Sequence, residues 1–256
     1  MFSPEYIASN FEDVVNVGLQ AHGLSIVDLK RAKRGAPWEY VRGGRRNRRI
    51  TGTTEFEVRG PAAGHALLKT VEDPTGTRVL GTLNNCAGGT TPWGTVLSGE
   101  ENFNQYFKGR GTAEEKRYGI SAAATSRGWE KVHDRFDLTK PGYENEANRF
   151  GWVVEIDPED PTSTPVKHTL LGRFKHEAGT AVISPSGHAV VYSGDDERHD
   201  YLYKFVSAEK VREGDKKHNM RLMDKGTLYV AKFSGDSPAA QILSLIHISE
   251  PTRPLY

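Results

Sequence analysis

The sequence predicts an all-β fold, and three observations support this. Short apolar stretches bounded by Gly, Pro, Asp and Asn recur along the chain, and no sustained apolar repeat of 3.6 residues accompanies them. The 256 residues include 27 glycines and 13 prolines, as is typical of a chain rich in turns. Long helices are therefore not expected. The predicted strands are 24–29, 94–98, 151–157, 180–184, 188–193, 201–206 and 227–233.

The last four of these segments fall within residues 178–233 and follow one another in close succession. Four successive strands of this kind form an antiparallel meander, which is the content of one blade of a β-propeller. We therefore expect a partial β-propeller with four-stranded antiparallel blades.

The chain is predicted to contain one domain, the partial propeller at residues 1–241, and a tail at 242–256. The tail reads ILSLIHISEPTRPLY and shows no continuation of the blade pattern. It resembles a translated sequencing adapter, so we interpret it as non-native and leave it out of the fold prediction. Residues from about 105 to 150 are strongly polar, and we expect them to form either a further blade or a large insertion on the surface.

One short sequence motif occurs twice in the chain, and the two copies carry different thiol or carboxylate side chains at equivalent positions. CAG at 86–88 leads into SGEE at 98–101, and EAG at 177–179 leads into SGDD at 193–196. Neighbouring strands of a meander run in opposite directions, so the start of the first strand and the end of the second lie at the same end of the sheet. We expect both copies to direct side chains toward one point.

These side chains have the chemistry of metal ligands. Crowded carboxylates raise one another's pKa unless a cation neutralises them. Carboxylates suit hard cations such as Ca²⁺ and Fe³⁺, whereas a thiolate favours a transition ion. Acid pairs in loops are also ordinary surface turns, and the repeat is the argument for a metal site. The candidate ligands are Cys86, Glu100, Glu101, Glu177, Asp195 and Asp196.

Three residues of the repeat allow more than one interpretation. Cys86 is the single cysteine, so it forms no internal disulfide and is a buried small side chain, a nucleophile or a metal ligand. No known cysteine-protease signature surrounds it, and metal ligation is the leading interpretation. His176 is a ligand, a structural histidine, or a residue behind the ligands that orients Glu177. We place Asn85 behind the ligands as well.

Composition and charge exclude several classes of partner. The formal net charge is +1, so no overall field favours nucleic acid, and the basic run at 42–49 is interpreted as a solvated loop. No run of eighteen apolar residues is present, so no membrane span is expected. The first residues, MFSPEYIASNFEDVV, show no basic segment followed by an apolar one, so no secretion signal is expected here.

Several long motifs resemble the PhoX-type alkaline phosphatases. They are GTLNNCAGGTTPWGTVLSGEENFNQYF (81–107), NRFGWVVEIDP (148–158), LGRFKHEAGTAV (171–182) and VYSGDDERHDYLYKFVS (191–207). The resemblance covers residues from about 20 to 235. It implies a six-bladed propeller, of which this chain would be about half, with Fe³⁺ and Ca²⁺ at its axis. The implied activity is hydrolysis of small-molecule phosphate monoesters in the periplasm or outside the cell, after twin-arginine export.

The resemblance also ranks the candidate residues. It implies that Cys86 binds iron and that Glu177 bridges metals. Glu101, with Asp195 or Asp196, is a weaker match and is assigned to the calcium side of the cluster on carboxylate chemistry, and Glu100 is a further candidate metal ligand. Further ligands and a phosphate-binding arginine would come from later blades, so we expect this fragment to be inactive and the complete protein to be a monomeric enzyme. The alternative is a non-catalytic propeller module that binds calcium and recognises a ligand, although such a site has no use for a thiol.

Overall fold

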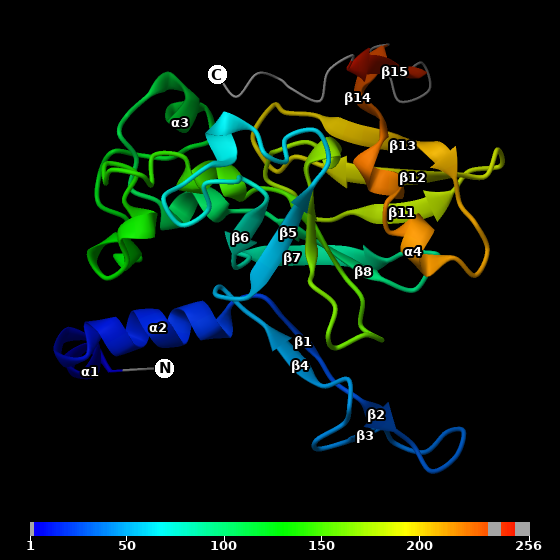
Figure 1. Cartoon of the computed structure of the whole chain (residues 1–256), viewed down its shortest axis with the longest axis horizontal. Helices are drawn as coiled ribbons and strands as arrows, with labels where there is room; N and C mark the ends of the chain where they lie inside the picture. Colours follow the sequence, from blue (N-terminus) through cyan, green and yellow to red (C-terminus); the bar gives the residue numbers. More distant parts are fainter. Residues whose placement is uncertain (1–2, 235–241, 249–256) are drawn as a thin grey trace.

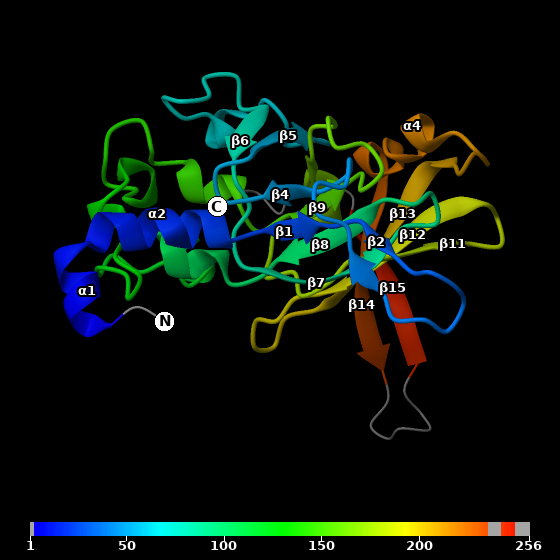
Figure 2. The same ribbon diagram turned by 90° about the horizontal axis from the view of Figure 1, so that it is seen from below.

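The computed structural model describes residues 3–234 and 242–248 and is built mainly from β-structure (Figure 1). Two larger sheets lie side by side, with β7 of the first next to β11 of the second (Figures 1 and 2). Two small two-stranded ribbons and the N-terminal helices extend from the first sheet. No sheet closes into a barrel within the described residues.

The first sheet has six strands in the order β6-β5-β10-β9-β8-β7. All neighbours are antiparallel except β10 and β5, which are parallel. Four of its strands, β7 to β10, follow one another as an antiparallel meander. The strand bounds are β5 Glu55–Arg59, β6 Arg78–Leu80, β7 Asn85–Thr90, β8 Val96–Glu100, β9 Val153–Ile156 and β10 Val166–His168.

The second sheet is an antiparallel meander in the order β11-β12-β13-β14-β15. The four strands predicted within 178–233 are confirmed. The bounds are β11 Thr180–Ile183, β12 His188–Gly194, β13 Leu202–Lys210, β14 Gly226–Ser234 and β15 Ile242–Ile248.

The strand β15 lies in the segment that we had left out of the fold. Residues 242–248 pair with β14 and add a fifth strand to the meander, a strand that the sequence prediction did not include. The non-native origin of 242–256 stays a prediction, and residues 249–256 lie outside the described part of the chain.

The remaining elements are short. The ribbons are β1 Leu24–Ile26 with β4 Arg48–Ile50, and β2 Leu29–Lys30 with β3 Glu39–Tyr40. The helices are α1 Pro4–Ser9, α2 Phe11–Ala21, α3 Ala113–Arg117 and α4 Lys216–Asn219. The 3-10 turns are η1 Ala66–Leu68, η2 Phe103–Tyr106, η3 Trp129–Lys131, η4 Asp134–Phe136, η5 Glu146–Arg149, η6 Thr169–Leu171 and η7 Leu222–Asp224.

Helix α2 was not among the predicted elements, although at 11 residues it is of average length. It buries Val15 and Leu19, which lie four positions apart on one face. Gly18 lies on the same side, where a Cβ atom would be 3.1 Å from the Trp129 ring, so the helix packs closely on the protein. Phe11 packs on the same core, so apolar residues recur every four positions along this face, but a helix of 11 residues is too short for the pattern to be sustained.

The segment between β8 and β9 is an insertion and contains no strand, so the alternative of a further blade is wrong. It is also more than a surface segment. Its aromatic side chains join the larger of the two hydrophobic cores and contact one another in edge-to-face and tilted pairs at centroid distances of 4.9–5.4 Å. The buried aromatic residues are Phe103, Tyr106, Phe107, Trp129, Phe136, Phe150 and Trp152.

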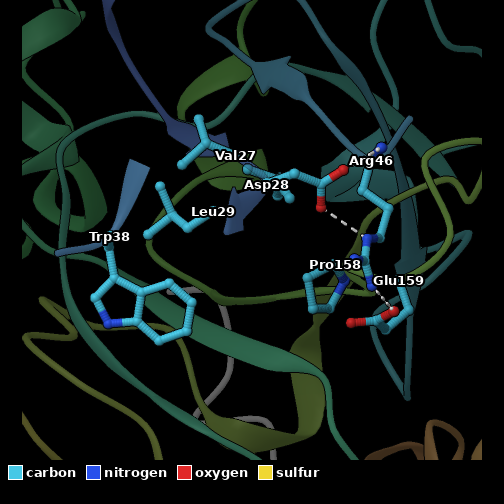
Figure 3. Close-up of a pocket in the computed structure, with 8 residues that line it drawn as sticks. Val27, Asp28, Leu29, Trp38, Arg46, Pro158 and Glu159 are labelled. Carbon is cyan, nitrogen blue, oxygen red and sulfur yellow. Dashed lines mark hydrogen bonds and ion pairs between the residues drawn. The ribbon is translucent and has the colours of Figure 1, made fainter. Parts of the chain in front are cut away.

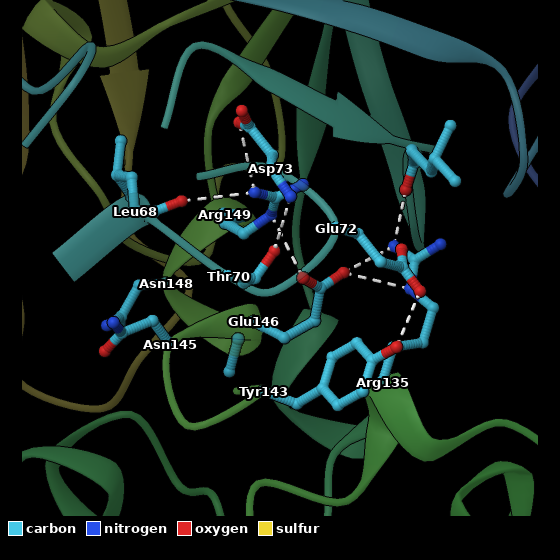
Figure 4. A network of polar contacts seen from close by, with 12 residues as sticks. Leu68, Thr70, Glu72, Asp73, Arg135, Tyr143, Asn145, Glu146, Asn148 and Arg149 are labelled. Carbon is cyan, nitrogen blue, oxygen red and sulfur yellow. Dashed lines mark hydrogen bonds and ion pairs between the residues drawn. The ribbon is translucent and has the colours of Figure 1, made fainter. Parts of the chain in front are cut away.

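A buried ionic network holds this insertion against the loop before β6 (Figure 4). Glu146 accepts from Arg135 at 2.7 Å and pairs with Arg149 at 3.0 Å, and Arg149 also reaches Asp73 at 3.3 Å. Both arginines also donate to backbone carbonyls of residues 68 and 80. Because each buried charge has a partner of opposite sign, burial of the network is tolerated.

A second buried network connects the two sheets. Glu155 on β9 accepts from the Trp93 indole at 2.9 Å and lies 2.8 Å from Nε2 of His168. Nδ1 of His168 lies 3.7 Å from a carboxylate oxygen of Asp224, which belongs to the second sheet's β13–β14 connection. Burial alone would lower the pKa of His168, but Asp224 and Glu155 outweigh it and the pKa is raised.

This arrangement predicts a pH-dependent component of stability. The folded-state pKa of His168 lies above its ordinary value of 6.5, so its contribution is complete below about pH 6.5 and is lost as pH rises through the folded pKa. We expect the free energy of unfolding to fall over that range by up to about 1.4 kcal/mol per pH unit. Urea unfolding of the wild type and of His168→Gln, measured from pH 6 to 9, checks this. Identical pH profiles for both proteins would contradict it.

Candidate metal centre

Four pairs of adjacent residues meet where the two sheets adjoin, and in each pair the first side chain is the more buried. Successive side chains of a strand point to opposite faces, so two neighbours in an extended segment cannot both face the same side. The inner members are Asn85, Glu100, His176 and Asp195. The outer members are Cys86, Glu101, Glu177 and Asp196.

The outer carboxylates converge. Glu101, Glu177 and Asp196 each place an oxygen within 4.8 Å of the others. Lys175, two positions before Glu177, forms an ion pair with Glu197 and not with any of the three acids. Within the part of the chain that the structure describes, none of the three acids forms an ion pair with a lysine or an arginine. Three uncompensated carboxylates at this separation repel one another, and a bound cation would remove that repulsion.

Cys86 lies beside this group. The pairing of β7 with β8 shifts register between Asn85 and Gly88, and this bulge carries the cysteine. The thiol is exposed. A backbone hydrogen bond at Ala87 lowers the pKa of Cys86, but partial burial and the neighbouring Glu101 and Glu177 raise it above the ordinary thiol value overall. The thiol is therefore close enough to both carboxylates to sense their charge.

Glu100, predicted as a ligand, is not brought to the acidic group. Its carboxylate is fully buried and accepts from the Lys167 ammonium at 2.6 Å. Burial lowers the pKa of Lys167 to about 8, against the opposing effect of Glu100. The Glu100 oxygens accept further hydrogen bonds, at 2.8–3.3 Å, from the Thr82 hydroxyl and the N–H groups of Leu83, Gly151 and Trp152.

The other inner residues are also engaged in the protein. The Asn85 amide donates to the Thr82 hydroxyl at 2.9 Å, and that hydroxyl donates to Glu100, so Asn85 lies behind the buried carboxylate. Asp195 accepts from the N–H groups of Lys175 and Glu197 through one oxygen. Burial raises the pKa of Asp195 to about 6, although the Glu197 hydrogen bond lowers it.

His176 is a buried neutral imidazole with both ring nitrogens occupied. Nε2 donates to the Gly172 carbonyl at 2.9 Å and Nδ1 lies 2.7 Å from the Ser193 hydroxyl. Burial lowers its pKa to about 3. Neither nitrogen is available to a metal. The side chain instead holds the backbone at position 176 in place and so positions the next residue, Glu177.

Glycine lets the two sheets meet closely at this point. A Cβ atom on Gly99 would lie 2.1 Å from the His176 carbonyl oxygen, so any larger residue would push the sheets apart. The His176 N–H also donates to the Glu100 carbonyl at 3.3 Å. The glycine shared by the repeat thus permits the contact that brings Glu101 and Glu177 together.

Sequence reasoning missed Asn84 and Asn102. Asn84 has a φ of 49° and accepts backbone hydrogen bonds from Glu101 and, through its side chain, from Asn102. The Asn102 amide donates to the Glu101 carboxylate at 2.5 Å. The signal was present in NNC and EEN, because asparagine is one of the few residues other than glycine that adopt left-handed backbone readily.

A surface groove of about 320 Å³ lies away from these residues, beside the β2–β3 ribbon (Figure 3). Arg46 crosses one side of it and pairs with Asp28 at 2.8 Å and with Glu159 at 2.5 Å. None of the predicted ligands lines this groove.

The fold and the acidic group define a β-sheet protein with a candidate cation site between two meanders. The chain belongs to the alkaline phosphatase PhoX family, whose model matches residues 5–253. It is similar to the solved structure of Pseudomonas fluorescens PhoX in complex with vanadate, a transition state analogue, with 48% sequence identity and a TM-score of 0.82. The match covers 87% of this chain but 39% of that one, so this chain spans about two fifths of its length.

No curated protein matches the chain. No helix within residues 3–234 or 242–248 has the length and apolar character needed to cross a membrane.

Because Glu100 and Lys167 form a fully buried ion pair, removing Lys167 should cost far more stability than removing a lysine from an exposed pair. Lys167→Met keeps the volume but leaves a fully buried carboxylate without its cation, so we expect a loss of about 3–5 kcal/mol in unfolding free energy. Lys140→Met, which removes an exposed pair with Asp134, is the control and should cost less than about 1 kcal/mol. Urea unfolding measures both, and equal losses would contradict the structural role assigned to Glu100.

Proposed function

We propose that the protein carrying this chain is a metal-dependent alkaline phosphatase that hydrolyses phosphate monoesters, with Fe³⁺ and Ca²⁺ held by the outer residues. The observation that carries the proposal is the convergence of Glu101, Glu177 and Asp196 within 4.8 Å, with the Cys86 thiol beside them. Family membership and the vanadate complex of the P. fluorescens relative support the reaction class.

The donor set fits these ions. Carboxylate oxygens are the ligands that calcium and ferric ions prefer, and a thiolate favours the transition metal. We assign Cys86 to iron, Glu177 to a bridging position, and Glu101 and Asp196 to calcium. When bound, the ions supply Lewis acidity toward phosphoryl oxygens and lower the pKa of an oxygen nucleophile.

The chain's own residues have two tasks in this proposal. The outer carboxylates would hold the metal cations in place. Because the phosphate ester is anionic, the position of these cations would set the position at which the substrate is attracted. The Cys86 thiol must lose its proton to become a ligand, and because its pKa is raised without metal, metal binding here should strengthen as pH rises.

We also propose that the meanders β7–β10 and β11–β14 are blades of a six-bladed propeller. The support is that each holds four successive antiparallel strands and that both direct their repeat toward one point. Further ligands would then lie on the remaining blades. Activity outside the cytoplasm is part of the same proposal and is supported by the family resemblance. The alternative, a non-catalytic calcium-binding module, would not require Cys86.

Substitutions at Glu100 and Glu101 should have different effects, because only Glu101 is a proposed ligand. Loss of a residue that supports a metal ligand typically weakens metal binding roughly 10- to 100-fold, and Glu101→Gln should weaken calcium binding by more than this. The same variant should have a free energy of unfolding near that of the wild type when no metal is bound. Glu100→Gln should instead destabilise the metal-free protein, because Lys167 loses its buried partner. Calorimetric titration with calcium and urea unfolding in chelator measure both. The reverse pattern would show that Glu100 is the ligand.

Substitution of Cys86 tests the assignment of iron and the phosphatase activity together. A ferric thiolate absorbs visible light by charge transfer, so the intact protein purified with iron should be coloured and Cys86→Ala colourless. Phosphatase activity toward a chromogenic monoester should fall in the same variant. A colourless wild type whose Cys86→Ala form remains fully active would refute the proposed function.

A further inference from the structure

A continuous series of hydrogen bonds leads from the end of helix α2 to the acidic group. Nε2 of His22 lies 2.7 Å from the Tyr106 hydroxyl, which also accepts from the Asn84 amide at 3.1 Å. Asn84 then accepts from the Glu101 N–H at 3.2 Å through its carbonyl and from the Asn102 N–H at 3.3 Å through its side chain. Residues far apart in the chain are thus linked to one candidate ligand.

The direction of each bond in this series is determined. Nδ1 of His22 donates to the Gly18 carbonyl at 2.6 Å, so in the neutral ring Nε2 carries no proton and accepts from Tyr106. Burial lowers the pKa of His22 and raises that of Tyr106, so the ring stays neutral and the hydroxyl keeps its proton. The Tyr106 oxygen is then free to accept from Asn84, and every group has one defined role.

Tyr106 is held rigidly at the centre of the series. It is buried, with its ring 4.9 Å from the Trp129 ring and 5.2 Å from the His22 ring in edge-to-face contacts. The Arg127 guanidinium lies over its face at 4.2 Å. Its hydroxyl is therefore a fixed point from which Asn84 can be oriented.

Asn84 needs that orientation because its backbone is unfavourable for a side-chain-bearing residue. Its φ of 49° places it in the left-handed region, which costs roughly 1–2 kcal/mol for most residues and less for asparagine. It stands two positions before Cys86 and bonds the backbone of Glu101. One residue therefore ties the β7 segment that carries the thiol to the loop that carries the carboxylate.

We propose that His22, Tyr106 and Asn84 are positioning residues that hold Cys86 and Glu101 in the geometry required for metal binding. The inference rests on the proposed function, since it assumes that these two residues are ligands. It assigns a role in the centre to the C-terminal end of helix α2 and to Tyr106 in the β8–β9 insertion, neither of which is a proposed ligand.

The decisive variant is Tyr106→Phe in the intact protein. It removes one hydroxyl, frees both Nε2 of His22 and the Asn84 amide, and preserves the aromatic packing. We expect calcium affinity, measured by calorimetric titration, to fall roughly 10- to 100-fold. Asn84→Gly, which suits the backbone angle but deletes the side-chain bonds, should show a loss of the same order.

The control is Tyr143→Phe, which removes a hydroxyl bonded to Glu72 at the surface and should leave calcium affinity unchanged. Thermal unfolding with chelator and with saturating calcium separates positioning from mere stability. A positioning role reduces the increase in Tm that calcium produces, whereas a purely structural role lowers both Tm values equally.

The outcomes distinguish the two proposals. Wild-type calcium affinity in Tyr106→Phe, an equal loss in Tyr143→Phe, or an equal lowering of both Tm values would overturn this inference and leave the proposed function intact. A wild-type protein that binds no metal and hydrolyses no phosphate ester would overturn both.

Discussion

The centre of this structure depends on the burial of one carboxylate. Glu100 lies at the end of β8 with no exposed surface, is paired with an equally buried Lys167 on β10, and accepts from the backbone N–H groups of the two residues before β9. A buried charge is tolerated only with such complete compensation. Because Glu100 must point inward, strand alternation directs Glu101 outward. The position of the candidate ligand therefore follows from the burial of its neighbour.

The second sheet repeats this logic with different chemistry. His176 is buried as a neutral ring with both nitrogens bonded, and Glu177 after it is exposed. The two inner residues meet through their backbones, with the His176 N–H on the Glu100 carbonyl at 3.3 Å, and Gly99 leaves room for that contact. Each sheet thus anchors one inner residue, and their direct contact sets the separation of the outer acids. The contact therefore joins an inner residue of one copy of the repeat to an inner residue of the other copy, and an outer candidate ligand follows each of them.

The repeat predicted which segments converge, and the apolar stretches predicted four of the five strands of the second sheet. The repeat did not separate the members of each acid pair, although the two-residue period of a strand could have done so for Glu100 and Glu101. Helix α2 and the insertion escaped prediction for a different reason. The buried aromatic residues around Phe103, Tyr106 and Trp129 follow no period, because 3-10 turns bury side chains according to tertiary contacts. Parallel pairing of β10 with β5 likewise depends on distant segments.

The separation into inner and outer residues also explains how the protein tolerates an acidic cluster. Charges in contact with water repel weakly, because the effective dielectric is high, whereas burial makes the ionised form costly. Asp195 illustrates the second case, since burial raises its pKa to about 6. Asp196, one position later, is exposed and adds its carboxylate to the cluster without that penalty. An uncompensated group of acids can therefore persist in the folded protein, and any cation that binds only the folded state stabilises it further.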